Sequence, residues 1–321
     1  METVLVTGGA GFIGSHVVER LAKDGHRVRV IDNLSTGDQA NLDGCRGQVE
    51  FLRGDLTEPV DCEVAVRGVS IIWHLAALPS VPRSMADPWA SHHHNVNATT
   101  RLLIAARDAK VRRVVYSSSS SVYGDTPTLP KVESMEPLPR SPYAAAKLSG
   151  EQYVLAFARA GLVEGVALRY FNVFGPRQSP RSAYAAVIPA FLAAAQNQTG
   201  VSVNGDGGQT RDFTYVENVV QANILAGFAA ADRVNGWVTN AGAGCRTSLL
   251  ELVAMCREVT GAPLPIEHRP PRDGDVRDSL ASLERASQVL GYRPSVGLRE
   301  GLERTWHWFK SAYAAGKIPA A

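Results

Sequence analysis

The sequence predicts an α/β fold, a doubly wound parallel sheet joined to a smaller, interleaved α/β domain. Three observations support this fold class. A short apolar strand at the start of the chain runs into a glycine-rich loop and then a helix. Candidate strands and helices alternate through the first half, which is typical of a parallel sheet with helices on both faces. Beyond Tyr170 this alternation stops, and glycine, proline and arginine become frequent.

The first element is an apolar strand over residues 4–7. It runs into the loop Gly8-Gly9-Ala10-Gly11-Phe12-Ile13-Gly14, and a helix is expected from Ser15 onwards with Val17 and Leu21 on one side. Glycines in such a loop allow a tight turn, close approach of a pyrophosphate and close packing of helix on strand. The helix N-terminus offers free N–H groups to phosphate. We interpret the loop as a nucleotide-binding turn; the alternative is a glycine-rich turn without a ligand.

A second strand over residues 27–31 ends at Asp32. An acidic residue at this distance from the glycine loop meets the hydroxyls of the adenosine ribose in dinucleotide-binding folds. Its carboxylate repels the 2′-phosphate of NADP, because both groups are negatively charged. Strand, glycines, helix and acid occur in the required order, so the sequence predicts that the bound dinucleotide is NAD.

The remaining elements of the first half follow the same alternation. Apolar runs predict strands over residues 49–53, 70–75, 113–117 and 165–170, and helices are expected at about 88–109 and about 142–160. Ligands in an open α/β sheet bind outside the carboxyl ends of the strands. Arginines in the loops beyond Tyr170 are therefore suited to a phosphorylated substrate, because the guanidinium group matches phosphate oxygens.

Tyr143 and Lys147 form the most informative pair of the chain. Pro142 fits the first turn of a helix, and residues four apart then share one helix face. An ammonium group beside a phenol favours the phenolate, so we expect a lowered pKa for Tyr143. A tyrosine tuned in this way can act as a general base or acid at an alcohol carbon.

The serine run Ser117–Ser121 follows the strand that ends near Tyr116. It therefore lies at the carboxyl edge of the sheet, where Tyr143 should also lie. One hydroxyl there could hydrogen-bond both a substrate alcohol and the tyrosine oxygen, and we assign this role to Ser119. For Ser117 and Ser118 the alternative, a polar turn whose hydroxyls cap backbone groups, stays open.

Composition and charge exclude several classes of protein. The chain has 321 residues, is 45% hydrophobic and carries a formal net charge of +2. This is enough for one large domain or two joined ones, and it gives no electrostatic reason to bind nucleic acid or a membrane. No apolar stretch reaches transmembrane length, and the first strand begins too early for a signal peptide. Four scattered cysteines indicate free thiols in a reducing cytosol, so we expect a cytoplasmic protein.

Two conspicuous groups receive no functional role. Adjacent histidines on a helix splay around its axis, so His92-His93-His94 predicts no metal site. Trp306 and Trp308, near the end of the chain, are interpreted as packing aromatics.

Further motifs extend the pattern around the glycine loop. They are Asp32-Asn33-Leu34-Ser35-Thr36-Gly37, Gly54-Asp55-Leu56, His74-Leu75-Ala76-Ala77 and, after Ser119, Val122-Tyr123-Gly124. Together with the Tyr143/Lys147 pair they resemble the extended short-chain dehydrogenases/reductases. Nearly the whole chain is similar to bacterial UDP-hexose 4-epimerases. The stretches that resemble the branch of these enzymes acting on UDP-N-acetylglucosamine are residues 128–133, 168–175, 183–189, 205–207, 211–213 and 274–277.

This resemblance implies a Rossmann-type NAD-binding domain at residues 1–171 plus about 213–242, and a UDP-sugar-binding domain at about 172–212 and 243–315. It implies NAD contacts from Gly8, Gly11, Phe12, Ile13, Gly14, Asp32, Asn33, Ser35, Gly37, Asp55, Leu56, Leu75, Ala76, Ala77, Asn95, Ser117, Tyr143, Lys147 and Tyr170. It also implies a homodimer in which the helices at about 96–109 and about 144–160 pair.

The resemblance assigns substrate contacts as well. Asn172, Arg211, Arg272 and Asp275 would hold UDP, and Ser80, Ser119, Ser120 and Ser121 would face the hexose. The remaining contacts would come from Arg181, Ala186, Val187, Val203 and Ser279.

The implied reaction is a 4-epimerisation of a UDP-hexose in nucleotide-sugar metabolism and polysaccharide biosynthesis. Tyr143 would take the proton of the 4-hydroxyl with Ser119 bridging, and a hydride would pass to NAD. The 4-ketose would turn its other face and take the hydride back, so the cofactor is expected to stay bound. Related dehydratases and decarboxylases carry a carboxylic acid just after the position of Ser119, where this chain has Ser120 and Ser121.

The choice of hexose stays open between alternatives. Ser279 falls where epimerases restricted to UDP-glucose carry a tyrosine, which favours UDP-GlcNAc/UDP-GalNAc, with or without UDP-Glc/UDP-Gal; the alternative is a surface serine. Pro79 and residues 179–182 depart from the N-acetyl branch. Arg181 could pair with a carboxylate of UDP-glucuronate or be a solvated loop arginine. A dehydratase, a decarboxylase and a non-catalytic NAD-binding scaffold are the alternatives of other classes.

Overall fold

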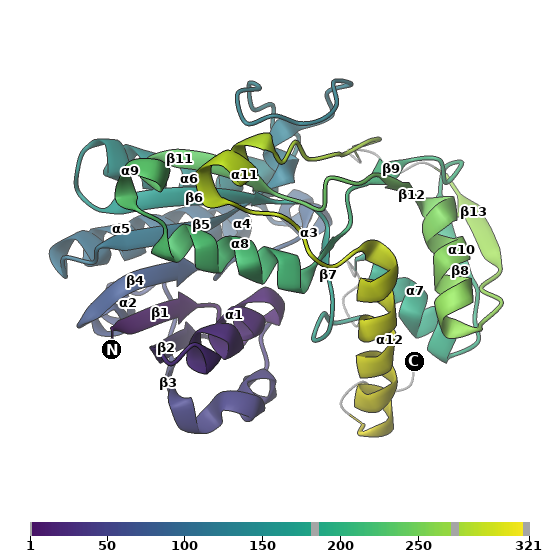
Figure 1. The fold of residues 1–321 in the computed structure, drawn as a ribbon, viewed down its shortest axis with the longest axis horizontal. Helices are drawn as coiled ribbons and strands as arrows, with labels where there is room; N and C mark the ends of the chain where they lie inside the picture. The colour runs from purple at the N-terminus through teal and green to yellow at the C-terminus, as the bar shows by residue number, and fades with distance from the viewer. Residues whose placement is uncertain (1, 181–185, 271–275, 317–321) are drawn as a thin grey trace.

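The computed structural model describes residues 2–180, 186–270 and 276–316. Its centre is a parallel sheet of seven strands in the order β11-β6-β5-β4-β1-β2-β3 (Figure 1). The strands are β1 Thr3–Thr7, β2 Arg27–Asp32, β3 Val49–Arg53, β4 Val69–His74, β5 Arg113–Ser119, β6 Glu164–Tyr170 and β11 Trp237–Ala241. The strand order reverses between β1 and β4, which places the crevice for a ligand at their carboxyl ends. The predicted fold class is confirmed.

Helices cover both faces of this sheet. On one face lie α1 (Phe12–Lys23) and α8 (Val216–Phe228), and on the other lie α2 (Pro59–Val66), α5 (Ala98–Asp108) and α6 (Pro142–Arg159). Side chains of β1 alternate between the two cores, because successive strand residues point to opposite faces. Val4 and Val6 pack with α1, whereas Leu5 packs with α2 and α5.

Two of the expected helices begin or continue differently from the prediction. The first helix begins at Phe12 rather than Ser15, because Gly11 already serves as its N-cap. The helix expected at about 88–109 is not one regular helix: α4 (Pro88–His92) passes into a π-helical segment (His93–Asn97) and then into α5. The helix expected at about 142–160 is confirmed as α6, and the Ser141 hydroxyl caps it by accepting a hydrogen bond from the Ala144 N–H at 3.1 Å.

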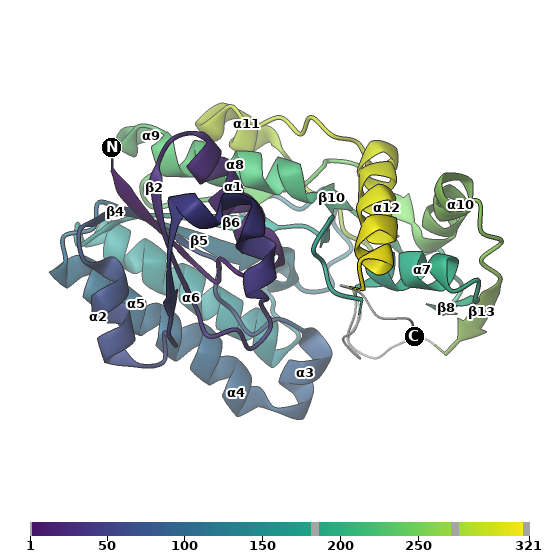
Figure 2. The ribbon, with the colours of Figure 1, turned by 90° about the horizontal axis from the view of Figure 1, so that it is seen from below.

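A second, smaller region lies beside the carboxyl edge of the sheet (Figures 1 and 2). It contains α7 (Val187–Gln196), α10 (Leu249–Thr260), α12 (Leu298–Ala314) and the parallel pair β8 (Val201–Asn204) and β13 (Ile266–Arg269). Two further pairs are β9 (Thr210–Arg211) with β12 (Thr247–Ser248), and β7 (Val173–Phe174) with β10 (Thr214–Tyr215). The short helices are α3 (Val81–Ala86), α9 (Ala231–Val234) and α11 (Glu284–Leu290), with 3₁₀ segments Gln39–Gln48 and Ser120–Tyr123. The chain leaves the sheet after β6, returns to it with α8 and β11, and leaves again.

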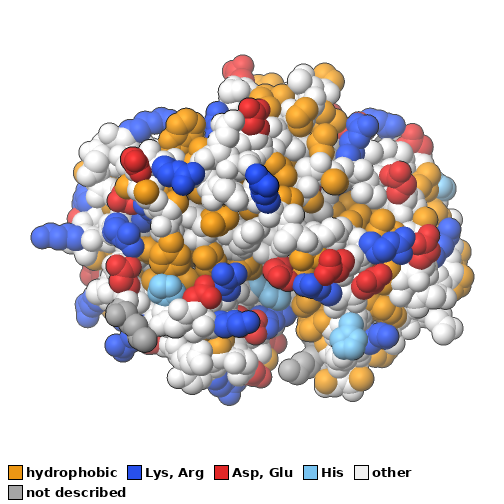
Figure 3. All heavy atoms as spheres, viewed as in Figure 1, with side chains coloured by type: hydrophobic (Ala, Val, Ile, Leu, Met, Phe, Trp, Pro, Cys, Tyr) orange, Lys and Arg blue, Asp and Glu red, His pale blue; other side chains and the backbone are white. Residues whose placement is uncertain are grey.

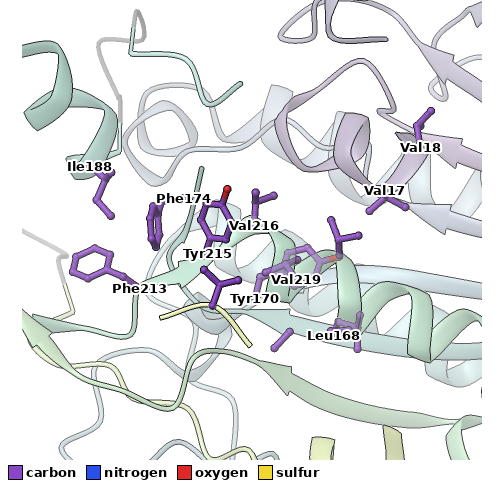
Figure 4. Packing of buried hydrophobic residues seen from close by; sticks show 14 of the residues in the cluster. Val17, Val18, Leu168, Tyr170, Phe174, Ile188, Phe213, Tyr215, Val216 and Val219 are labelled. Carbon is purple, nitrogen blue, oxygen red and sulfur yellow. The ribbon is translucent and has the colours of Figure 1, made fainter. Parts of the chain in front are cut away.

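One hydrophobic cluster runs through both regions (Figure 4). Val17 and Leu168 belong to the sheet and its helices, whereas Ile188 and Phe213 come from the smaller region. The contact is close at Gly301 of α12, where a Cβ atom would lie 2.7 Å from the Phe174 ring. The two regions therefore share one continuous hydrophobic core.

The surface mixes charges of both signs. On the face shown in Figure 3, lysine and arginine side chains are interspersed with aspartate and glutamate rather than gathered into one patch. Among the described residues, the helices are all too short or too polar to cross a membrane.

Candidate active site

A cavity of about 1000 Å³ opens at the carboxyl ends of the sheet strands. Nearly all of the residues predicted to contact NAD line it: Gly8, Gly11, Phe12, Ile13, Gly14, Asp32, Asn33, Ser35, Asp55, Leu56, Leu75, Ala76, Ala77, Ser117, Tyr143, Lys147 and Tyr170. Of the predicted substrate contacts, Ser80 and Ala186 line it as well. The cavity therefore joins the glycine loop to the Tyr143/Lys147 pair across one continuous surface.

The glycine loop forms a cradle that side chains would fill. Gly8 has φ of 67°, and a Cβ atom there would lie 2.7 Å from the Ala76 backbone. A Cβ atom on Gly14 would lie 2.1 Å from the carbonyl oxygen of Gly8. The first turn of α1 carries no acidic residue, so its N–H groups face the cavity without a competing carboxylate. These features fit the pyrophosphate of a dinucleotide.

Asp32 lies at the end of β2 on the wall of this cavity. Its carboxylate accepts hydrogen bonds from the N–H groups of Ala10 at 3.0 Å and Leu34 at 2.8 Å. Burial raises its pKa, and these two hydrogen bonds act in the opposite direction. Gly37 lies directly against Asp32, since a Cβ atom on Gly37 would be 3.1 Å from the Asp32 carboxylate. Gly37 is not among the residues that line the cavity. The backbone thus fixes Asp32 where an adenosine ribose would meet it.

Asn95 supports the cavity wall from behind. It is buried, and its amide group bonds both the N–H of Leu78 at 2.9 Å and the carbonyl oxygen of Leu78 at 3.1 Å. Leu78 itself lines the cavity. Asn95 therefore holds the segment that follows Ala76 and Ala77 in place.

His74 at the end of β4 is fully enclosed. Its Nε2 lies 2.9 Å from the hydroxyl of Thr99 and its Nδ1 lies 2.8 Å from the hydroxyl of Thr7. The Thr99 hydroxyl donates to Asn95, and the Thr7 hydroxyl accepts from the N–H of Ala76, so the neutral ring with its proton on Nε2 satisfies every partner. Burial, helped by the positive Lys147, lowers the pKa of His74 to about 3.

The stability of the fold should therefore fall on acidification through His74. Below about pH 6.5, the ordinary pKa of histidine, His74 binds a proton in the unfolded chain but stays neutral in the folded chain. The free energy of unfolding therefore falls by up to about 1.4 kcal/mol for each pH unit of acidification. Urea unfolding between about pH 6.5 and pH 4.5 should show a steeper loss for the native chain than for His74→Gln. Equal slopes for the two proteins would mean that His74 does not carry this effect.

Tyr143 and Lys147 lie on one face of α6, as predicted, and both line the cavity. Lys147 Nζ donates to the carbonyl oxygen of Ser117 at 2.8 Å and lies 3.4 Å from its hydroxyl. Burial lowers the pKa of Lys147 to about 7. The pKa of Tyr143 is raised to about 12 by burial, although a hydrogen bond with Ser119 opposes this.

The expected lowering of the Tyr143 pKa is thus wrong for the protein by itself. The reason is desolvation, which acts on both members of the pair and disfavours the charged form of each. The spacing of four residues correctly placed both groups on one helix face, but it carried no information on how deeply the fold buries them.

The serine run divides into two parts. The hydroxyl of Ser117 donates to the carbonyl oxygen of His74 at 2.9 Å, and that of Ser118 donates to the Glu151 carboxylate at 2.6 Å. Ser119 instead meets Tyr143 and accepts from the N–H and the hydroxyl of Ser121. Ser117 and Ser118 thus bond to the interior, whereas Ser119 lies near Tyr143. Ser119, Ser120 and Ser121 lie outside the cavity lining proper.

Several predicted substrate contacts are not among the described residues that line the cavity. The amide of Asn172 donates to the hydroxyl of Ser279 at 3.2 Å, so these two residues meet. Arg211 donates to backbone carbonyl oxygens of Thr210 and Arg277. Val203 is buried in the core of the smaller region, and Val187 begins α7. Arg181, Arg272 and Asp275 lie outside the described residues.

The cavity also contains Trp308 of α12, interpreted from the sequence as a packing aromatic. No periodic signal distinguishes Trp308, because it reaches the site from an element distant in sequence. Arg177, after β7, lines the cavity as well, and it is one of the loop arginines beyond Tyr170 that suit a phosphorylated substrate. Among the described residues there is no group of three or more histidine, cysteine or acidic side chains that could hold a metal ion. His92 and His93 stack against Trp89 instead.

Comparison with known proteins identifies the family. The model of the NAD dependent epimerase/dehydratase family matches residues 4–242. A UDP-glucose 4-epimerase of Mycolicibacterium smegmatis is 41% identical over 314 residues, which are 96% of this chain and 98% of the relative.

Solved structures agree in fold along nearly the whole chain. The UDP-N-acetylglucosamine 4-epimerase from Methanobrevibacter ruminantium, in complex with UDP-N-acetylmuramic acid, has a TM-score of 0.91 at 39% identity and covers 97% of this chain and 99% of its own. The UDP-glucuronic acid 4-epimerase from Bacillus cereus, in complex with UDP-glucuronic acid and NAD, has a TM-score of 0.90 at 30% identity and covers 97% and 100%. NAD is therefore the cofactor of this enzyme, and the chain belongs to the NAD dependent epimerase/dehydratase family.

Proposed function

We propose that this enzyme is a UDP-hexose 4-epimerase. The observation that carries the proposal is Tyr143 on the wall of the NAD cavity, with Ser119 near enough to act on its pKa and followed in the chain by Ser120 and Ser121. A hydroxyl pair can move a proton on and off a sugar alcohol, whereas the carboxylic acid that related dehydratases and decarboxylases carry just after the position of Ser119 is replaced here by Ser120 and Ser121. The similarity to 4-epimerases over nearly the whole chain supports the same reaction.

Tyr143, Ser119 and Lys147 each have a separate role in this reaction. Bound NAD would supply a hydride acceptor and, after the turn of the sugar, a hydride donor. In its phenolate form Tyr143 takes the proton from the 4-hydroxyl and later returns it, and the nearby Ser119 hydroxyl bridges the two oxygens. Lys147 fixes the end of β5 through the carbonyl oxygen of Ser117. UDP serves as the anchor, so binding energy is spent away from the reacting carbon and the hexose stays free to rotate.

For the substrate we propose UDP-GlcNAc/UDP-GalNAc together with UDP-Glc/UDP-Gal. Ser279 is a small residue whose hydroxyl lies near the amide of Asn172 and the N–H of Asp212. A serine there leaves more space than the tyrosine of glucose-restricted enzymes, which favours a 2-acetamido group. UDP-glucuronate is the alternative, and it depends on Arg181, which lies outside the described residues.

Proton NMR tests the function directly. Purified protein is incubated with UDP-GlcNAc, UDP-Glc or UDP-GlcA in separate tubes without added NAD, and the spectra are followed for the matching 4-epimer. We expect epimers of the first two sugars. Heat-denatured protein serves as the control. If no tube contains an epimer even after NAD is added, the proposal is wrong; if the UDP-GlcA tube is the fastest, the uronic acid is the substrate.

We further propose a cytoplasmic homodimer formed through α5 and α6. Ile104 of α5 and Tyr153 of α6 are large side chains left exposed on these neighbouring helices, and covering such surfaces stabilises association. Light scattering after gel filtration should give twice the chain mass of 34.4 kDa, with a shift toward the monomer for Tyr153→Glu. A single-chain mass for the native protein would contradict the dimer.

The proposed cytoplasmic location is supported by the four cysteines, which are free and therefore suit a reducing cytosol. Activity in the membrane fraction of cells would contradict that location.

A further inference from the structure

Arg177 connects the smaller region to the first helix of the sheet domain. It lies on the loop after β7, and its Nη2 donates to the Glu19 carboxylate of α1 at 2.7 Å. The preceding residue, Pro176, offers its carbonyl oxygen to Nε2 of His16 at 3.0 Å. Two neighbouring residues of this loop are therefore bonded to α1, the helix whose N-terminus opens into the cavity.

The guanidinium group of Arg177 is incompletely paired. Among the described residues, its Nη1 is buried without a hydrogen-bond partner, and the whole side chain is 19% exposed. Arginine keeps its charge in proteins, and a buried donor left unpaired is costly enough that it calls for an explanation. Nη2 is held by Glu19, and other atoms of the Arg177 side chain line the cavity, so the unpaired Nη1 belongs to a guanidinium group at the cavity wall.

We propose that Arg177 binds a phosphate of the NAD pyrophosphate through Nη1, opposite the N–H groups at the start of α1. A guanidinium group anchored on one edge by a carboxylate presents its other edge to an anion in a fixed direction. Gly11 and Phe12 of the α1 N-terminus line the same cavity. The phosphate would thus be held from both sides.

The position of Arg177 favours the cofactor over the diphosphate of UDP. Its partner Glu19 lies close to Gly44, since a Cβ atom on Gly44 would be 3.4 Å from the Glu19 carboxylate. Gly44 belongs to the 3₁₀ segment after β2 and lines the cavity beside Asp32. These contacts link Arg177 through Glu19 to the segment that follows β2 and Asp32, where the adenosine half of the dinucleotide is expected.

The contact has a kinetic consequence. The loop after β7 is bonded to α1 through Arg177 and Pro176. A dinucleotide bound by Arg177 should therefore dissociate slowly, because its release requires the phosphate contact of Arg177 to break. Slow release of NAD suits an enzyme whose cofactor is reoxidised within each turnover. The inference rests on NAD as the cofactor and on the proposed retention of NAD, and it does not depend on which UDP-hexose is the substrate.

Binding measurements on Arg177→Met test the proposal without any turnover assay. The NAD carried through purification is quantified after heat release, and calorimetry with stripped protein gives the dissociation constants of NAD and of UDP. We expect the NAD dissociation constant to rise about 10- to 100-fold, the range for one lost charge-assisted hydrogen bond or a pair of them. The UDP dissociation constant should stay nearly unchanged. The NAD dissociation constant of Arg177→Lys should lie between those of the native chain and Arg177→Met, because lysine keeps the positive charge but lacks the paired N–H donors of the guanidinium group.

Arg20→Met is the matched control. Arg20 is also on α1 and pairs with Asp24 at 2.8 Å, but it does not line the cavity. Unchanged NAD affinity in Arg177→Met would overturn the proposal, and so would weaker UDP binding with NAD binding intact, which would assign Arg177 to the substrate diphosphate. If Arg177→Met does not fold, Arg177→Lys decides by the same criteria. A chain that binds NAD as expected yet makes no epimer would contradict the proposed function and leave this proposal standing.

Discussion

Replacing Tyr143 by phenylalanine is expected to slow epimerisation about 10²- to 10⁴-fold, the usual contribution of a positioned acid or base. The substitution removes the phenol oxygen that meets Ser119 and keeps the ring that lines the cavity. NAD content should therefore stay at the native level. Initial rates with the best UDP-hexose, together with the NAD released on heating, separate loss of chemistry from loss of cofactor.

Tyr153→Phe provides the matched control for this experiment. Tyr153 lies on the same helix, but its side chain is exposed and does not line the cavity. Its variant should keep the native rate. If Tyr143→Phe also kept the native rate, another group would have to move the proton, and the role proposed for Tyr143 would be wrong.

Replacing Glu151 by alanine should destabilise the protein by about 3–5 kcal/mol, the cost of leaving a buried charge without its partner. Glu151 and Arg169 are 0% and 2% exposed, and their side chains are bonded at 2.6 and 3.0 Å. The same carboxylate accepts from Ser118 at 2.6 Å. Its loss therefore leaves the Arg169 guanidinium and the Ser118 hydroxyl unsatisfied beneath the active site. Urea unfolding monitored by circular dichroism measures the difference.

An exposed ion pair offers the comparison. Glu217 pairs with Arg304 at 2.7 Å, but both side chains are open to solvent. Glu217→Ala should cost no more than about 1 kcal/mol, because water replaces the lost partner. Similar losses for the two variants would show that burial does not set the strength of the Glu151–Arg169 pair. Since Ser118 precedes Ser119, we also expect slower turnover in Glu151→Ala.

Much of the fold could be predicted because its signals are local. Apolar runs of five or six residues marked the strands, and the glycine loop followed by Asp32 marked the dinucleotide site. Ser141 and Pro142 marked the start of α6. The strand runs, the glycine loop and the start of α6 each depend on residues within a few positions of one another, and Asp32 follows the loop at the distance set by one helix and one strand. The start of α1 and the π-helical segment before α5 were missed, because neither leaves a distinct pattern in the sequence.

The amino-acid sequence by itself determined the fold class and the cofactor, and the spacing of Tyr143 and Lys147 placed both on one helix face, because a helix converts a short spacing directly into geometry. Only the tertiary structure decided the chemical state of those residues. Burial raises the pKa of Tyr143 and lowers that of Lys147, and burial is a property of the whole packed chain. The same holds for Arg177, whose partner Glu19 is 158 residues away. Contacts at such separations arise only when the sheet domain and the smaller region pack together, and no local pattern in the sequence encodes them.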